Sequence, residues 1–133
     1  MNEPYVLDAF AIVAYLRQEK GGEAVRNLLI RAQNREVTLA FCLVNYGEVL
    51  YLAEREGGLK AATEVIRVVE QLPLQVIPVD RELTFAAAHV KACHPISFAD
   101  AFVVALAQKL DATVVTGDPD FRKVEGRISV EWL

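Results

Sequence analysis

The sequence predicts an α/β fold in which a parallel sheet of about four to five strands is flanked by helices on both faces. Strand-like and helix-like segments alternate along the chain, and the strand-like segments are continuous apolar runs. Such runs are typical of parallel strands covered on both faces, whereas strands with one solvated face alternate apolar and polar residues. The length of 133 residues fits one hydrophobic core, and no linker-like segment or repeat divides it, so we expect a single domain over residues 1–133.

Local patterns predict the elements in the first half of the chain. The run Tyr-Val-Leu-Asp at residues 5–8 predicts the first strand, and the β-branched, apolar run at residues 37–41 predicts the second. Apolar residues at helical spacing predict helices at residues 10–17, 23–34, 43–55 and 60–71. Glycine pairs at residues 21–22 and 57–58 separate these helices.

The second half of the chain repeats the alternation. The run Gln-Val-Ile-Pro-Val at residues 75–79 predicts a third strand, and its proline favours an edge of the sheet or a strand end. Asp80 is placed to cap the helix that follows. Further helices are expected at residues 81–91 and 97–110, and further strands at residues 113–116 and 128–132.

Cysteine usage and hydropathy favour a cytoplasmic protein with no membrane partner. Cys42 and Cys93 lie in apolar surroundings without CxxC or Cys/His spacing, so we expect both to be small buried residues in a reducing compartment. The amino-terminal residues carry no signal-peptide pattern. Residues 37–53 are strongly apolar, but Asn45 and Glu48 interrupt them, which favours a buried strand and helix over a membrane span.

Acidic residues follow two of the predicted strands. Asp8 ends the first strand, and Asp118 follows the fourth strand after Thr116 and a glycine. Because ligands of open α/β sheets bind beyond the carboxyl ends of the strands, we expect these acids at the functional edge. Each has a local interpretation as well, since Asp8 precedes a helix and Asp118 precedes Pro119, a common helix start.

Two more acids lie within apolar helices. Asp100 is surrounded by apolar residues, and burying a lone carboxylate costs several kcal/mol unless it is paired or neutralised. A capping box with Ser97 is the alternative explanation, and it is compatible with a site at the strand ends. Glu48 has mostly apolar neighbours on its helix. A place in the site and a place on the exposed surface are equally good interpretations of this residue.

If these carboxylates converge, they require cations. Two carboxylates about 4 Å apart repel by about 4 kcal/mol at an effective dielectric constant of about 20. Oxygen-rich acidic clusters suit Mg²⁺ or Mn²⁺, and the lack of a His/Cys set argues against zinc. The net charge of −4 comes from 18 acids and 14 bases, so the charges outside the four candidate acids balance. The net charge therefore does not argue against a nucleic-acid partner.

Four segments in this order resemble the PIN domain family, and most closely the VapC-type toxins of toxin–antitoxin modules. The segments are Val-Leu-Asp-Ala at 6–9, Asn-Tyr-Gly-Glu-Val-Leu at 45–50, Ile-Ser-Phe-Ala-Asp-Ala at 96–101 and Val-Thr-Gly-Asp-Pro-Asp-Phe at 115–121. The resemblance spans essentially the whole chain. No single segment is specific, but the order and spacing of all four are.

The resemblance implies a helical sandwich around a parallel sheet and RNA cleavage that depends on Mg²⁺ or Mn²⁺. It assigns the acidic quartet of the family to Asp8, Glu48, Asp100 and Asp118. Asp120 matches an accessory acid, and Thr116 matches the hydroxyl that often accompanies the fourth acid. The implied mechanism is metal-assisted hydrolysis with one ion held mainly by Asp8, Asp100 and Asp118. The chain departs from the pattern at Ala9-Phe10, where a Ser or Thr is frequent.

The resemblance also implies partners, namely an RNA substrate, a cognate antitoxin protein and a second copy in a homodimer. Arg17 and Lys20, after the first helix, are candidates for contacts to RNA phosphates, and a solvated rim is an equally good interpretation of both. We expect His89 and His94 to be structural or surface residues.

Three other functions fit parts of the pattern. A structure-specific DNA nuclease on the same fold and a non-catalytic binding module would keep most of these residues. A receiver-like phosphoacceptor domain also places acids at strand ends. It would need a paired acid after the first strand and a lysine after a late strand, and neither is evident.

Overall fold

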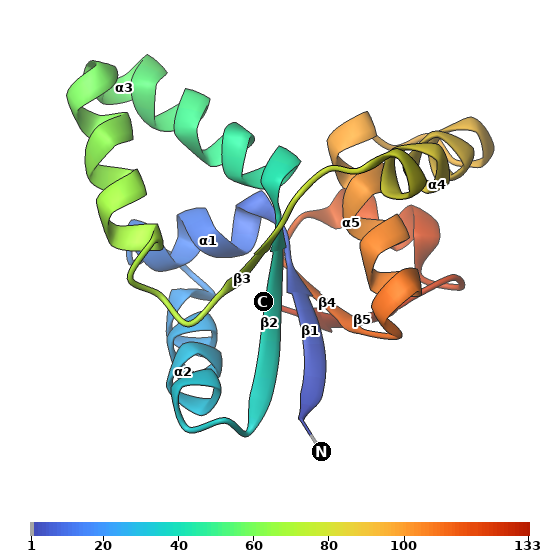
Figure 1. Cartoon of the computed structure of the whole chain (residues 1–133), viewed down its shortest axis with the longest axis horizontal. Helices are drawn as coiled ribbons and strands as arrows, with labels where there is room; N and C mark the ends of the chain where they lie inside the picture. Colours follow the sequence, from blue (N-terminus) through green and yellow to red (C-terminus); the bar gives the residue numbers. More distant parts are fainter. Residues whose placement is uncertain (1) are drawn as a thin grey trace.

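Five parallel strands form the centre of the molecule, in the order β3-β2-β1-β4-β5 (Figure 1). A computed structural model describes residues 2–133. The strands are β1 (Glu3–Leu7), β2 (Val37–Cys42), β3 (Gln75–Ile77), β4 (Thr113–Thr116) and β5 (Ser129–Trp132). The predicted parallel sheet is confirmed, with β3 at one edge as its proline indicated.

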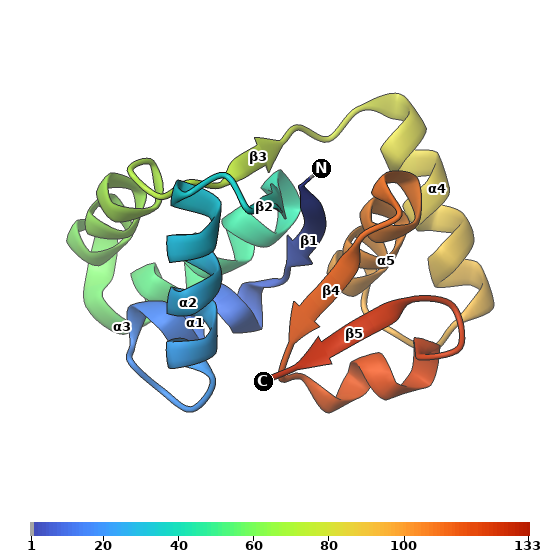
Figure 2. The same cartoon turned by 90° about the horizontal axis from the view of Figure 1, so that it is seen from below.

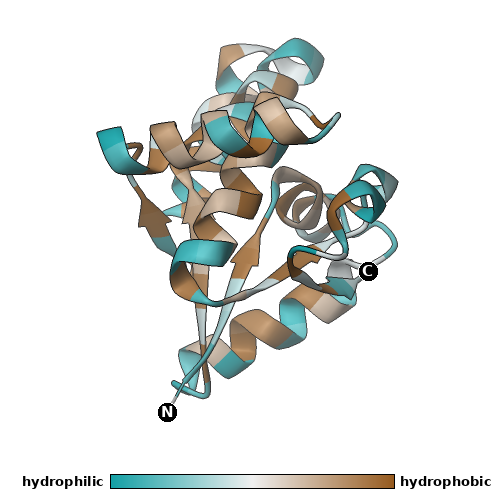
Figure 3. Ribbon diagram, turned by 90° about the vertical axis from the view of Figure 1, so that its right-hand side faces the viewer, coloured by the Kyte–Doolittle hydropathy of each residue, from teal (hydrophilic) through white to brown (hydrophobic). Residues whose placement is uncertain are grey.

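Helices cover both faces of this sheet, which gives the predicted three layers (Figures 1 and 2). One face carries α1 (Ala9–Leu16), α2 (Gly22–Gln33) and α3 (Leu43–Val69). The other face carries α4 (Arg81–Cys93), α5 (Phe98–Leu110) and the short 3₁₀ helix η1 (Pro119–Val124). The flanking helices combine apolar and hydrophilic residues along their length, as helices that cover a sheet require (Figure 3).

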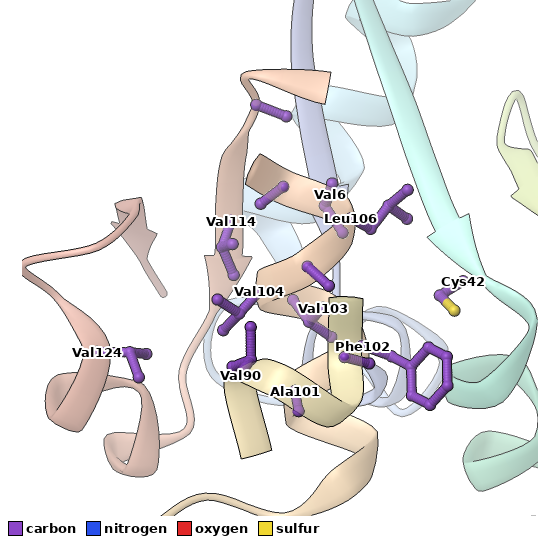
Figure 4. Packing of buried hydrophobic residues seen from close by; sticks show 14 of the residues in the cluster. Val6, Cys42, Val90, Ala101, Phe102, Val103, Val104, Leu106, Val114 and Val124 are labelled. Atoms are coloured by element: carbon purple, nitrogen blue, oxygen red, sulfur yellow. The ribbon is translucent and has the colours of Figure 1, made fainter. Parts of the chain in front are cut away.

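The sheet separates two hydrophobic cores, because successive side chains of a strand point to opposite faces. On β1, Tyr5 and Leu7 pack with α1, α2 and α3, whereas Val6 packs with α4 and α5. The second core is built largely on α5, whose Leu106 is almost completely buried (Figure 4). Burial on both sides explains why the strands are continuous apolar runs.

The separate helices predicted at residues 43–55 and 60–71 are present as the two limbs of α3, which join across an internal break. The break lies at Gly58, whose φ of 75° and ψ of −177° are not helical. Glycine adopts this left-handed backbone without the steric cost that a β-carbon imposes. The helix continues up to Gly57, so only Gly58 of the glycine pair interrupts the helical backbone.

Two details differ from the sequence-based expectations. The third strand ends at Ile77 because Pro78 has no N–H to donate to a neighbouring strand. The prediction that both cysteines are buried is correct for Cys42 and wrong for Cys93, which is exposed near the end of α4. In residues 2–133, no single helix has the length and apolar composition to cross a membrane. The helices α4 and α5 pass that test only as a pair bent by 116°.

The close contact between α1 and α2 makes Gly22 a sensitive position. A β-carbon at Gly22 would lie 2.5 Å from the carbonyl oxygen of Ala14, which belongs to the backbone of α1 and cannot rotate away. We expect Gly22→Ala to lower the free energy of unfolding by about 1–3 kcal/mol, as overpacking typically does. Gly47→Ala is the control, because a β-carbon there meets nothing within 4 Å and stabilises a helix by about 0.5–1 kcal/mol. Urea unfolding of both variants measures the difference, and equal stabilities would contradict the contact.

Candidate functional site

The order of the strands fixes where a site can form. The chain builds β2 and β3 on one side of β1 and then crosses to build β4 and β5 on the other side. In open α/β sheets, ligands bind beyond the carboxyl ends of the two strands that flank such a reversal, here β1 and β4. Asp8 follows β1 directly, and Asp118 follows β4 by two residues. The topology therefore brings the acids at the strand ends to the same edge.

Asp8 is almost completely buried, with 3% of its surface exposed. Its Oδ1 accepts a hydrogen bond of 2.9 Å from the backbone N–H of Ala11, so Asp8 is the N-cap of α1. Its Oδ2 accepts a hydrogen bond from the hydroxyl of Thr116. The capping and the site interpretations of Asp8 are therefore compatible, because one oxygen serves the helix and the other faces β4.

Thr116 connects the two strand ends. Its fully buried hydroxyl donates to Asp8 and accepts a hydrogen bond of 2.9 Å from the backbone N–H of Asp118. Asp118 in turn caps η1, because its Oδ1 accepts from the N–H of Asp120 at 2.9 Å. A chain of hydrogen bonds thus runs from the first strand to the loop after the fourth.

Three aspartates bring their oxygens together at this edge. Asp100, Asp118 and Asp120 each place one carboxylate oxygen within 4.8 Å of the others. Asp100 and Asp118 are half-buried and Asp120 is exposed. The hydroxyl of Ser97 accepts from the N–H of Asp100 at 3.1 Å, so the expected cap of α5 exists and leaves the carboxylate of Asp100 available.

Glu48 reaches the site through Asn45, a residue that the sequence-based analysis did not assign a role. Asn45 is completely buried on α3, and its Nδ2 donates to Glu48 Oε1 at 3.0 Å and to the carbonyl oxygen of Ala99 at 3.3 Å. One amide therefore holds Glu48 against the residue that precedes Asp100. The available signal was an uncharged polar residue in an apolar helix, three positions before an acid.

Burial and mutual repulsion raise the pKa of two of these acids. Burial raises the pKa of Asp8 to about 7, and the charges of Asp100 and Asp118 add to this, although Thr116 and Ala11 oppose it by hydrogen bonding. The pKa of Asp100 is raised to about 6, mainly because the carboxylate is buried and also because Asp118 is negatively charged nearby. Asp8 and Asp100 therefore hold their protons to a higher pH than ordinary aspartates do, and a bound cation would compete with these protons.

The chemistry of this donor set fits a hard divalent cation. All candidate ligands are carboxylate oxygens, which Mg²⁺ and Mn²⁺ prefer, and the two histidines lie on or just after α4. Asp80 caps α4 by accepting from the N–H of Leu83 at 2.8 Å, as expected from its position. The arrangement can hold a cation at the edge of the sheet where a phosphate could also bind.

Arg17 and Lys20 lie at the opposite end of α1 from Asp8. Arg17 follows the last residue of α1 and forms an ion pair with Glu56 of α3. Lys20 is exposed in the turn before α2. Eight helical residues at 1.5 Å each place this end about 12 Å from the amino end of α1.

Comparisons with known proteins agree with this architecture. No curated protein sequence matches the chain. VapBC2 from Rickettsia felis, solved with a promoter DNA fragment, superposes with a TM-score of 0.74 at 18% identity, covering 96% of this chain and 97% of that one. VapC20 from Mycobacterium tuberculosis, a toxin that cleaves the sarcin-ricin loop, gives 0.72 at 20% identity, with coverages of 96% and 98%. DNA-bound VapBC from Salmonella typhimurium gives 0.73 at 18% identity, with 98% of both chains covered.

These solved structures support the fold, and the family follows from the sequence profile of the PIN domain, which matches residues 5–127. The matched segment contains every acid at the strand ends as well as Glu48 and Asn45. The chain is therefore a member of the PIN domain family.

Proposed function

We propose that this protein is a metal-dependent endoribonuclease that acts as the toxin of a type II toxin–antitoxin module. The observation that carries the proposal is the group of Asp100, Asp118 and Asp120 beside the buried Asp8, at the carboxyl ends of β1 and β4. Similarity to VapC20, which is a cleaving toxin, supports the activity. Similarity to several VapBC complexes supports a cognate antitoxin.

In the proposed mechanism, Asp8, Asp100 and Asp118 hold Mg²⁺ or Mn²⁺, and Asp120 contributes from the rim. When bound, the ion supplies charge neutralisation of the scissile phosphate and a water of lowered pKa. Thr116 keeps the carboxylate of Asp8 in place, and Asn45 keeps Glu48 beside Asp100. Glu48 is therefore positioned to accept a proton from an attacking water or to complete the set of cation ligands.

The natural setting that we propose is the cytoplasm, with the toxin as a homodimer neutralised by its antitoxin. The proposed substrate is single-stranded RNA or a loop in a structured RNA. Among residues 2–133, Arg17, Arg26, Arg67 and Arg122 are paired with carboxylates, which limits the basic surface that non-specific duplex binding needs. Unpaired bases also expose edges and faces that duplex RNA hides.

Cleavage assays with matched RNA and DNA oligonucleotides test this proposal. With Mn²⁺ present, we expect preferential cleavage of single-stranded RNA, and we expect Asp100→Asn to lower the rate by more than about 100-fold. That loss would exceed the 10–100-fold effect typical of residues that only orient metal ligands. Full activity of Asp100→Asn in contaminant-free protein would contradict the assigned site, and preferential cleavage of double-stranded DNA would favour a structure-specific DNA nuclease.

Divalent cations should raise the thermal stability, because they bind the folded acidic cluster and not the unfolded chain. We expect Mg²⁺ or Mn²⁺ to raise the Tm of the wild-type protein and the gain to shrink in Asp8→Asn. Asp80→Asn is the matched control, since Asp80 also follows a strand and caps a helix but lies outside the cluster. Calorimetry measures both gains. If Asp80→Asn abolished the gain, the cation would bind beyond β3 and the assigned site would be wrong.

Without cations, the free energy of unfolding should fall as the pH rises from about 4 to about 7. Asp8 has an ordinary pKa of 3.8 and a pKa of about 7 in the fold, and that of Asp100 is about 6. The folded chain thus holds protons that the unfolded chain has released, so this stabilisation is complete below pH 4 and is lost through the folded pKa values. Urea unfolding in a chelator measures the slope, and Asp8→Asn should flatten it. A rising slope that Asp8→Asn abolishes would contradict the raised pKa of Asp8.

A further inference from the structure

We propose that Tyr51 and Arg55 of α3 form an RNA subsite, in which Tyr51 stacks on a base and Arg55 binds a phosphate next to the scissile one. This inference rests on the proposed ribonuclease function and adds a binding site to it. The two residues are defined here as the α3 subsite. They lie outside the acidic cluster and have no part in cation binding.

The geometry of α3 places the subsite in line with Glu48. Residues seven positions apart on an α-helix differ by only about 20° in direction and by about 10.5 Å along the axis. Arg55 is therefore two turns beyond Glu48 on the same side of α3, and Tyr51 lies between them along the axis, about 60° round the helix from Glu48. Because Asn45 holds Glu48 toward α5, this side of α3 faces the site rather than the core.

The course of α3 makes this line accessible to a strand that leaves the site. The helix starts at the carboxyl end of β2 and runs outward on one side of the strand ends, while α4 and α5 lie on the other side (Figure 1). Tyr51 has 46% of its surface exposed. An RNA strand with its scissile phosphate at the aspartates and its next nucleotides along α3 would meet Tyr51 first and Arg55 second.

Arg55 is prepared for a phosphate. Its guanidinium carbon lies 4.7 Å from the centroid of the Tyr51 ring, which orients the planar group while leaving its N–H donors in the plane. Within residues 2–133, most arginines have a carboxylate partner, as Arg17 has in Glu56 and Arg67 has in Glu64. Arg55 forms no such ion pair in this part of the chain. It is a positioned cation without a carboxylate partner among the described residues.

A hollow of about 290 Å³ adjoins the pair and is lined by Tyr51, Glu54 and Arg55. At about 30 Å³ for each water in the liquid, this space corresponds to roughly ten waters. The exposed carboxylate of Glu54 repels phosphate on its side of the hollow. A phosphate is therefore expected at Arg55 and an uncharged base at Tyr51, which is how single strands commonly bind to stacking platforms.

Binding of labelled RNA to a cleavage-deficient protein tests the α3 subsite. The probe is a fluorescein-labelled, mixed-sequence single-stranded RNA pool, and all variants carry Asp100→Asn so that bound RNA stays intact. We expect Tyr51→Ala and Arg55→Ala each to weaken binding by about tenfold and Tyr51→Phe to preserve it, because only the ring is needed. Glu54→Gln should strengthen binding, since it removes a repelling charge.

Salt dependence separates the roles of the two residues from a general loss of structure. Arg55→Ala should lower the slope of log K against log salt concentration by about 0.7, the value for one lost contact to a single strand, while Tyr51→Ala leaves the slope unchanged. Arg127→Ala is the matched control. Arg127 is also exposed and outside the ion pairs of the described chain, but it precedes β5 at the opposite end of the sheet.

Three outcomes would overturn the inference. If Arg55→Ala and Arg127→Ala lowered RNA affinity equally, Arg55 would contribute only through the overall surface charge. Unchanged RNA affinity in both Arg55→Ala and Tyr51→Ala, with wild-type protein cleaving RNA, would remove the subsite while the ribonuclease function stands. Wild-type protein that neither binds nor cleaves RNA would overturn the proposed function together with the subsite.

Discussion

A buried carboxylate must be supplied with hydrogen-bond donors, and the way in which Asp8 obtains them organises this molecule. One donor is local, the N–H of Ala11, and the other is the hydroxyl of Thr116, which lies 108 residues away in sequence. The second bond exists only if β4 pairs directly with β1. The same pairing brings the loop after β4 to the end of β1, so the positions of Asp118 and Asp120 depend on the contact that satisfies Asp8.

The acids at this edge also share a second structural role. Asp8 caps α1, Asp118 caps η1, and Asp100 lies in the first turn of α5 behind its cap, Ser97. Helix amino termini carry a partial positive charge that stabilises nearby anions. The elements that carry these acids therefore offset part of the repulsion among them. Local helix signals and site chemistry reinforce each other here.

Much of this arrangement can be predicted from the sequence, because it follows from local patterns. The strands, the burial of both sheet faces and the candidates Asp8, Asp100 and Asp118 are each marked by neighbouring residues. What could not be predicted depends on contacts between distant segments. The role of Asn45 requires the carbonyl of Ala99 from another helix, and the exposure of Cys93 depends on which side of α4 meets α5.

The break at Gly58 determines how far α3 extends from the sheet. A straight helix of 27 residues would be about 40 Å long, more than the diameter of a small domain. The left-handed glycine turns the chain, so the second limb returns, buries Ala62 and Val69, and delivers the chain to β3. The tip between the limbs is thus a place where added helical turns would lengthen the arm without moving the strand ends, because surface insertions cost little in closure entropy. The length of this arm and the geometry of the acidic edge can therefore evolve independently.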